Sequence, residues 1–241
     1  MKLSIVVPAK NEEAVLPGLF KTIENQMFRD FEVIVADAHS TDRTRETASA
    51  FGAKVVDGGM PGPGRNRGAT ASSGDILLFV DADVQLPNER YLGDVVAEFE
   101  QRAADVATCR LKPMSDRIDD KVGHAVFNHY TKLFERIRAH AAGSCILSRR
   151  PVHDAIGGFD ERVVFAEDQE YVQRAHRNGY RFRMLESHPM HVSVRRLEKD
   201  GRLSIASKYL YSEAYMLLKG PMVDRLPFEY RFAHFDGKDN S

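Results

Sequence analysis

The first half of the chain alternates short apolar runs with stretches that carry apolar residues at helical spacing. The apolar runs have the length of strands and occupy residues 3–7, 32–36, 54–56 and 76–80. Between the first two runs, Leu16, Leu19 and Ile23 fall on one helical face. Polar residues gather just after the strands end. This order predicts a βαβα unit with right-handed crossovers, whose parallel strands deliver the residues that follow them to one edge of the sheet.

Turn and capping residues set the expected limits of these elements. Residues 11–13 are expected to cap the first helix, and Ser40 or Thr41 the second. Gly52 is a suitable residue to end the second helix. The loop at 58–64 consists almost wholly of glycine and proline, and we expect it to lead into a short third helix.

The second half of the chain predicts a less regular mixture of elements. We expect strands at 106–111, 143–148, 181–185 and 190–194, and helices at 88–101, 119–141, 167–179 and 203–219. The long helix at 119–141 places Val122, Val126 and Leu133 on one side. The helix at 203–219 is apolar nearly all round. This pattern favours burial against the rest of the protein, or a homodimer contact, over peripheral contact with a membrane.

Two aspartates follow the apolar run at 76–80. A run of five apolar residues is typical of a strand buried in the middle of a parallel sheet. Asp81 and Asp83 lie two residues apart, and on an extended chain such residues point to the same side. Two carboxylates in one small volume favour a divalent cation that prefers oxygen ligands, Mg²⁺ or Mn²⁺. The alternative is an ordinary strand that ends in a polar loop.

Composition and charge restrict the class of protein. The chain has 241 residues, of which 43% are hydrophobic, enough to bury a real core in one large or two small domains. Because 34 Lys and Arg balance 35 Asp and Glu, we expect no nucleic-acid partner held by bulk electrostatics. Cys109 and Cys145 lack the spacing of metal ligands and fit buried thiols. Without a long apolar run, the sequence predicts a soluble, cytoplasmic protein.

Several short motifs, in order along the chain, resemble those of family 2 glycosyltransferases. They are SIVVPAKNEE at 4–13, VADAHSTDRT at 35–44, GRNRG at 64–68, VDAD at 80–83, GGFDE at 157–161 and EDQE at 167–170. The resemblance spans about residues 3 to 185. It implies an α/β protein with the GT-A fold, a Rossmann-like, mostly parallel central sheet flanked by helices, here with a C-terminal helical extension.

The resemblance also implies how the chain is divided and what it does. Residues 1–194 are expected to form the GT-A domain, with a nucleotide-sugar-binding half at 1–110 and an acceptor-binding half at 111–194. Residues 195–241 are expected to form the helical extension and a tail. The implied activity is metal-dependent transfer of a sugar from a UDP- or GDP-sugar to a carbohydrate or lipid-linked acceptor, with inversion. The Gln-x-x-Arg-Trp signature of processive synthases is absent, which favours a single transfer.

In the donor site, the resemblance assigns roles to five residues. It places the nucleotide against Pro8 and Glu12 and its base against Asp37, and it places Arg65 near the nucleotide or diphosphate. Asp81 is expected to contact the ribose or a metal-bound water. Taken alone, Glu12 is equally well explained as a carboxylate at a helix N-terminus, and Arg65 as a solvated arginine. Alanine follows Asp37 where the family has a second aspartate, so the nucleotide is not identified.

The reaction itself is assigned to two further carboxylates. Asp83 matches the direct metal ligand, and a cation there would offset the charge that develops on the leaving diphosphate. Asp168 matches the general base that takes the proton of the acceptor hydroxyl. Gly158 and Glu167 are expected to contact the acceptor. The alternative for Asp168 is that acidic residues simply favour the start of a helix.

A third metal ligand is expected near the end of the domain. His188 and His191 are the candidates, and His191 is preferred because it lies in an alternating, strand-like segment. The alternative is a structural histidine. The basic cluster at 195–202 either closes over the diphosphate or forms a solvated face.

Two other classes of protein share parts of this pattern. A sugar-phosphate nucleotidyltransferase needs a glycine-rich, basic loop after its first strand, where this chain has the acidic, glycine-free segment 8–13. A silent module that only binds nucleotide-sugar needs no general base, whereas Asp81, Asp83 and Asp168 are present together here. A glycosyltransferase is therefore the preferred interpretation, with these two as alternatives.

Overall fold

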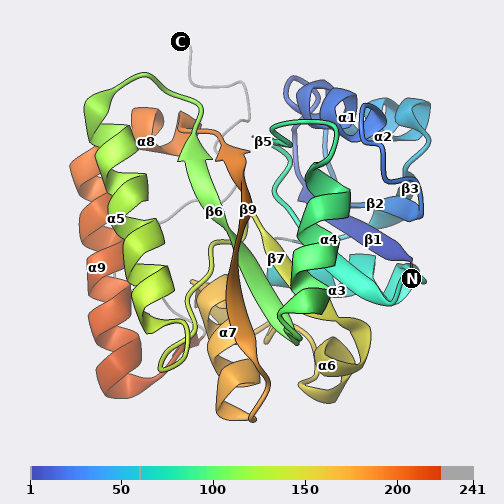
Figure 1. Ribbon diagram of the computed structural model, residues 1–241. Helices are drawn as coiled ribbons and strands as arrows, with labels where there is room; N and C mark the ends of the chain where they lie inside the picture. The colour runs from blue at the N-terminus through green and yellow to red at the C-terminus, as the bar shows by residue number, and fades with distance from the viewer. Residues whose placement is uncertain (1, 60, 224–241) are drawn as a thin grey trace.

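The protein is described by a computed structural model that covers residues 2–59 and 61–223. Its centre is a curled, eight-stranded sheet in the order β3-β2-β1-β4-β7-β6-β9-β5, flanked by helices (Figure 1). The strands are β1 (Leu3–Ala9), β2 (Phe31–Asp37), β3 (Lys54–Asp57), β4 (Ile76–Phe79), β5 (Val84–Gln85), β6 (Val106–Pro113), β7 (Ile146–Arg149) and β9 (Phe182–Val192). A two-stranded ribbon pairs β8 (Val163–Phe165) with β10 (Met222–Val223). The predicted tail lies outside the described residues.

The first strands form the parallel part of the sheet, as their apolar runs predict. β1 pairs in parallel with β2 on one side and with β4 on the other. The five residues from Ile76 to Val80 are at most 1% exposed, which confirms the predicted buried strand. The prediction that its surroundings are parallel is half wrong, because β7 pairs with β4 in the antiparallel direction. The sheet as a whole is nevertheless mainly parallel, which confirms the α/β class.

β9 is one strand where the sequence predicts two. It pairs in parallel with β6, and its register shifts between Cys109 and Leu111 of that partner. The shift accommodates extra residues of β9 without ending the strand. The turn-like residues at 186–189 therefore bend the strand instead of dividing it.

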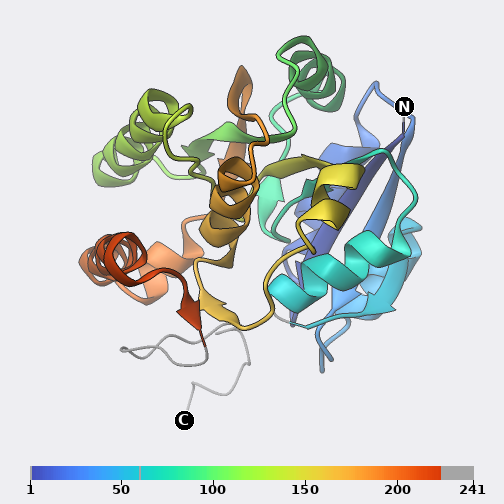
Figure 2. The same cartoon turned by 90° about the horizontal axis from the view of Figure 1, so that it is seen from below.

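Helices cover both faces of the sheet (Figure 2). They are α1 (Leu16–Glu24), α2 (Thr44–Phe51), α3 (Gly62–Ala71), α4 (Tyr91–Gln101), α5 (Ile118–Phe134), α6 (Arg150–Ala155), α7 (Glu167–Arg177), α8 (Arg195–Lys199) and α9 (Arg202–Lys219). Successive residues of a strand face opposite sides, so the strands supply two cores. Ile5 and Val7 of β1 pack with α1 and α4, whereas Val6 packs with α3, α6 and α7. The strands are thereby held from both sides.

The expected caps of α1 and α2 are wrong, and both errors have one cause. α1 begins only at Leu16 and α2 at Thr44, and neither helix has a side-chain cap. The side-chain oxygen of Asn11 instead accepts a hydrogen bond from the backbone N–H of Thr41 at 2.8 Å, and the N–H of Asn11 donates to Ser40 at 2.9 Å. The expected capping residues thus bind the two loops to each other. Gly52 ends α2 in the left-handed conformation, as predicted.

α5 is shorter than predicted, and its apolar side faces outward. It ends at Phe134, where the next residue, Glu135, is buried and accepts a hydrogen bond from the backbone N–H of Met184. Val122 and Val126 are 55% and 64% exposed, whereas Asp120 on the opposite side is 2% exposed. The helix attaches to the domain through polar contacts and Phe127, which packs against the core, and not through its apolar stripe.

α9 lies beside α5 on the same side of the molecule (Figures 1 and 2). Its apolar stripe, like that of α5, faces outward. Arg202 donates to Asp120 at 2.7 Å, and Glu213 pairs with the buried His140. Ile205 is 3% exposed and Met216 packs against the cluster of Phe165, Ala166 and Met222, so one side of α9 is buried as expected. Leu203 and Leu210 on its other side are 88% and 74% exposed, so the expected burial holds only in part. We name the outward apolar residues of both segments the α5–α9 face; they are Ile118, Val122, Val126, Leu133, Ile137, Leu203, Leu210, Leu217 and Leu218. No helix within residues 2–59 and 61–223 is long and apolar enough to cross a bilayer.

Two helical glycines provide a matched test of packing. A Cβ added to Gly68 in α3 would overlap Cγ1 of the buried Val6, whereas one added to Gly123 in α5 would meet nothing within 4 Å. We expect Gly68→Ala to destabilise the fold by about 1–3 kcal/mol through overpacking. Gly123→Ala should stabilise it by about 0.5–1 kcal/mol through helix propensity. Urea unfolding measures both, and a stabilised Gly68→Ala variant would contradict the packing of α3 on β1.

Candidate active site

The candidate site lies where the carboxyl ends of β1, β2 and β4 meet the first turns of α3 and α7. Parallel α/β sheets bind their ligands at this edge, because the loops that follow the strands diverge there. The sequence-predicted residues at these strand ends and helix starts are Pro8, Glu12, Asp37, Arg65, Asp81, Asp83, Glu167 and Asp168. The edge is acidic, and three arginines from outside the strands, Arg45, Arg65 and Arg195, pair with its carboxylates.

Arg65 is the buried centre of this edge. Its side chain is 2% exposed, and its guanidinium nitrogens contact Oε1 of Glu167 at 2.6 Å and Oδ1 of Asp81 at 3.0 Å. The ring of Phe159 lies 5.4 Å from the guanidinium carbon. A buried guanidinium requires anionic partners, and here one partner comes from each half of the chain. The alternative of a solvated arginine at the start of a helix is therefore wrong.

Asp168 is held in place by backbone N–H groups. Its two carboxyl oxygens accept hydrogen bonds from the N–H of Gly143 at 2.7 Å and from its neighbour Gln169 at 2.8 Å. Burial, with the nearby negative charge of Glu167, raises the pKa of Asp168 to about 7. The carboxyl group can therefore exchange a proton near neutral pH.

Gly143 is a site residue that sequence reasoning missed. A Cβ at this position would overlap Nη2 of Arg65 and lie 3.5 Å from Oδ2 of Asp168, so the backbone can approach both only as glycine. The signal in the sequence is slight: a run of small residues, Ala141, Ala142 and Gly143, precedes β7. Tyr209 of α9 was also missed, and its ring lies 5.6 Å from that of Phe165, just before α7.

Asp83 and Glu12 share a second arginine. Nε and Nη2 of Arg195 donate to Oδ2 of Asp83 at 3.1 and 2.9 Å, and Nη2 also donates to Oε2 of Glu12 at 3.0 Å. Burial raises the pKa of Glu12 to about 7, with contributions from the negative charges of Asp83 and Asp81. The two aspartates follow β4 in a turn rather than on an extended chain, so they take different partners. The expectation of an extended chain at these two residues is therefore wrong.

Asp37 is fully buried at the end of β2. Oδ2 accepts hydrogen bonds from the backbone N–H of Ser40 and from Arg45, both at 3.1 Å. Oδ1 has no hydrogen-bond partner within the part of the chain that the structure describes. A buried carboxylate oxygen without a donor is costly, so this atom is suited to receive an N–H group from a ligand.

Pro8 and Gly158 have structural neighbours that explain their positions. Pro8 lies in β1, where a Cβ on Gly64 of α3 would approach its side chain to 3.1 Å. Gly158 is in the left-handed conformation at φ 69°, and a Cβ there would lie 2.5 Å from Oδ1 of Asn66. The structure places Gly158 against Asn66 and His153, and the role predicted for it in acceptor binding stays a prediction.

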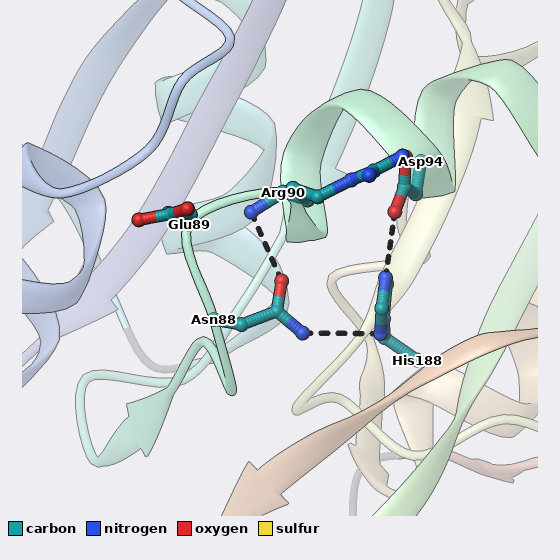
Figure 3. A pocket seen from close by; sticks show the side chains of 5 residues that line it. All are labelled: Asn88, Glu89, Arg90, Asp94 and His188. Carbon is teal, nitrogen blue, oxygen red and sulfur yellow. Dashed lines mark hydrogen bonds and ion pairs between the residues drawn. The ribbon is translucent and has the colours of Figure 1, made fainter.

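The histidines considered as metal ligands do not join the acidic edge. His188 contacts Asp94 at 2.8 Å and Asn88 at 3.2 Å and lines a separate pocket with these residues (Figure 3). His191 lies in β9 opposite Gln85 of β5. Across residues 2–59 and 61–223, no three His, Cys, Asp or Glu side chains gather in a position to hold a metal ion together. The assignment of His191 as a third ligand stays a prediction.

The chain is an α/β protein whose acidic residues gather at the carboxyl ends of its first strands, the edge at which sheets of this kind bind their ligands. The sequence profile of glycosyl transferase family 2 matches residues 4–157, which is more than half of the chain. The chain therefore belongs to glycosyl transferase family 2. This finding confirms the resemblance drawn from the six motifs.

Two relatives illustrate the extent of the similarity. The chain is 27% identical over 248 residues to poly(ribitol-phosphate) beta-N-acetylglucosaminyltransferase TarS of Staphylococcus aureus, which covers 98% of this chain and 42% of TarS. It is 30% identical over 211 residues to a PGL/p-HBAD biosynthesis glycosyltransferase of Mycobacterium bovis, covering 83% of this chain and 78% of that protein. The chain thus spans less than half the length of TarS.

Solved structures agree on the fold. Residues 1–349 of S. aureus TarS, in complex with UDP-GlcNAc, match with a TM-score of 0.67 at 24% identity over 80% of this chain and 58% of that one. The mannosyltransferase PcManGT from Pyrobaculum calidifontis, in complex with GDP-Man and Mn²⁺, matches with a TM-score of 0.67 at 19% identity. The match covers 91% of this chain and 70% of that one. The predicted GT-A fold is therefore confirmed.

The raised pKa of Asp168 predicts a pH-dependent cost in stability. Between the ordinary value of 3.8 and about 7, the folded protein binds a proton that the unfolded chain does not. The stability that this bound proton contributes is complete below pH 3.8 and is lost as the pH rises through about 7. Asp168→Asn should therefore stabilise the protein at pH 8 by about 1–2 kcal/mol, with the difference shrinking toward pH 4. Urea unfolding across this range measures it, and a difference that does not vary with pH would contradict the assigned pKa.

Proposed function

We propose that this chain transfers one sugar from a nucleotide-diphosphate sugar to an acceptor hydroxyl, with inversion at the anomeric carbon. The observation that carries the proposal is the presence of two centres at one sheet edge. Asp168 has a pKa of about 7, and Glu12 and Asp83 together hold a single cationic group. Direct displacement needs both, a base at the attacking hydroxyl and positive charge at the leaving diphosphate.

In this reaction Asp168 accepts the proton of the acceptor hydroxyl. The hydroxyl oxygen forms a bond to the anomeric carbon as the bond from that carbon to the diphosphate oxygen breaks, and the electron pair leaves with the nucleoside diphosphate. The N–H groups of Gly143 and Gln169 fix the direction of the carboxyl group. Its pKa of about 7 lies close to the operating pH, which is where a general base is most effective.

The donor is proposed to be a UDP- or GDP-sugar. Oδ1 of Asp37 can accept an N–H group of either uracil or guanine, and the burial of this atom makes the hydrogen bond favourable. UDP-GlcNAc is bound in TarS and GDP-Man in PcManGT, the solved structures most useful for comparison here. Pro8 and Glu12 would contact the nucleotide, and Asp81 and Arg65 the ribose and diphosphate.

Glu12 and Asp83 fit a divalent metal ion. Both carboxylates already contact one cationic group, the guanidinium of Arg195. Their oxygen atoms are the hard ligands that Mg²⁺ and Mn²⁺ prefer. Mg²⁺ is commonly held by only one or two carboxylates, with water and substrate phosphates completing its shell, so two protein ligands suffice. When bound, such an ion offsets the negative charge of the leaving diphosphate. PcManGT was solved with Mn²⁺, which supports the choice of metal.

The acceptor is proposed to enter beside the start of α7. Glu167 lies next to Asp168 there, and the rings of Phe165 and Tyr209 border the same region. Aromatic side chains with a few polar groups are the usual lining of a small-molecule site.

One incubation separates the three classes of function. The protein is mixed with UDP-, GDP- and dTDP-sugars and Mn²⁺, and release of nucleoside diphosphate is followed by chromatography. Slow hydrolysis of one donor is expected from a glycosyltransferase without its acceptor. Consumption that depends on pyrophosphate would favour a sugar-phosphate nucleotidyltransferase, and donor binding without release would favour a silent binding module.

Asp168→Asn should lower donor turnover about 100- to 10,000-fold and leave donor affinity unchanged, because the amide preserves the shape but accepts no proton. Asp154→Asn, at an exposed position of α6, is the matched control and should keep wild-type turnover. Turnover and donor affinity are measured separately, by product release and by calorimetry. Near-normal turnover of Asp168→Asn would show that another group is the base.

The α5–α9 face is proposed to contact an anionic membrane surface. Its nine apolar side chains are exposed, and the two helices carry four lysines, Lys121 and Lys132 on α5, which pair with Asp116 and Glu186, and Lys208 and Lys219 on α9. The acidic residue of α9, Glu213, points inward to His140. An apolar stripe edged by lysines is typical of helices that lie in a membrane interface. In a homodimer through this face, the lysines of the two copies would lie close together and repel each other, which disfavours the homodimer contact.

Vesicle flotation tests the membrane contact. The protein should float with vesicles of anionic phospholipid and much less with zwitterionic ones. Leu210→Glu should reduce the floating fraction about tenfold or more, because it places a charge in the centre of the stripe. Met27→Glu, an equally drastic change at a residue 66% exposed elsewhere, is the control. The proposal would be contradicted if the protein did not float with either kind of vesicle and sedimented as a dimer, and if Leu210→Glu converted that dimer to a monomer.

A further inference from the structure

Arg195 occupies the position of a cation between two carboxylates that come from distant parts of the chain. Its guanidinium contacts Asp83 after β4 and Glu12 after β1, at distances of 2.9 to 3.1 Å. The side chain is 27% exposed, so the contact lies at the mouth of the site rather than in the core. The basic cluster at 195–202 is therefore no simple solvated face, because its first residue enters the site.

Glu12 and Asp83 need positive charge near them whether or not a ligand is bound. Asp81 lies close enough to add its own negative charge to both. Like charges in a partly buried site repel, and a cation between them removes the repulsion. Arg195 supplies that cation in the protein by itself.

We propose that Arg195 competes with the divalent metal for Glu12 and Asp83, so that loading the metal with the donor displaces this arginine. The inference rests on the proposed function, in which the same two carboxylates hold the metal. A guanidinium and a divalent ion on one carboxylate pair repel each other strongly at these distances. Each therefore weakens the binding of the other by the same factor, as linkage requires.

The surroundings of Arg195 suit such a displacement. It is the first residue of α8, a helix of five residues that buries none of them. A segment with little buried surface can shift at low cost in free energy. The released guanidinium remains beside the mouth of the site, where its planar fork can bind the oxygens of the donor diphosphate. The arginine thus changes from a partner of the carboxylates to a partner of the donor.

Manganese binding to the full chain, without nucleotide, tests the inference. Free Mn²⁺ is measured by electron paramagnetic resonance during titration of the wild type and of Arg195→Ala, Arg195→Lys, Lys199→Ala and Asp83→Ala. Arg195→Ala should bind Mn²⁺ about tenfold more tightly than the wild type. Arg195→Lys keeps the charge and should stay near the wild type. Lys199→Ala removes an exposed charge from the same helix and should change the affinity by less than about twofold, because solvent and salt screen it.

The outcomes separate this inference from the proposed function. If Arg195→Ala binds Mn²⁺ no more tightly than the wild type and Asp83→Ala loses Mn²⁺ binding, the proposed competition is overturned. The metal site itself is then still supported. Unchanged binding by Asp83→Ala overturns the metal site itself. Circular dichroism and thermal unfolding of each variant establish that it is folded. A second measurement, UDP affinity with Mn²⁺ present, should weaken in Arg195→Ala, since the released guanidinium is expected to hold the diphosphate.

Discussion

The buried guanidinium of Arg65 is the interaction on which the candidate site depends. It joins α3 in the first half of the chain to α7 in the second through Glu167, 102 residues away in sequence. Removing one partner of a buried ion pair typically costs about 3–5 kcal/mol, because the remaining charge stays desolvated. Gly143 allows the backbone to approach Arg65 and Asp168 together. The geometry of the proposed base is thus tied to the positive centre beside it.

A second arginine organises the other side of the same edge. Arg195 gathers Glu12 and Asp83, while Arg65 gathers Asp81 and Glu167. Both arginines come from outside the strands that carry the aspartates. The acidic edge therefore holds its carboxylates in pairs, each around one cation, before any ligand arrives. Each arginine offsets the repulsion between the two carboxylates that it contacts, and Arg195 is the more exposed of the two arginines.

Two helices of the second half, α5 and α9, attach to the sheet differently from α1, α4 and α7. α1, α4 and α7 attach through apolar faces that complete the two cores of the sheet. α5 and α9 attach through polar contacts such as Arg202 with Asp120 and through a few apolar side chains such as Phe127 and Met216, and they turn their apolar stripes outward. Helical periodicity alone predicts the stripe but not its direction. The inward polar residues carry that information: Asp120 pairs with Arg202 of α9, and Asn128 with the backbone of Leu111 in β6.

The sequence by itself determined the strands of the parallel half, the buried run at 76–80, the motifs of glycosyl transferase family 2 and the residues of the acidic edge. These features are local, since alternation, apolar runs and short motifs depend on neighbours in the chain. Tertiary structure alone decided which groups meet. The loops of Asn11 and Ser40 bind each other instead of capping helices, and Arg195 reaches Glu12 across 183 residues. Such pairings depend on the topology that brings distant segments together, because the free energy of a charge depends on its partners in space.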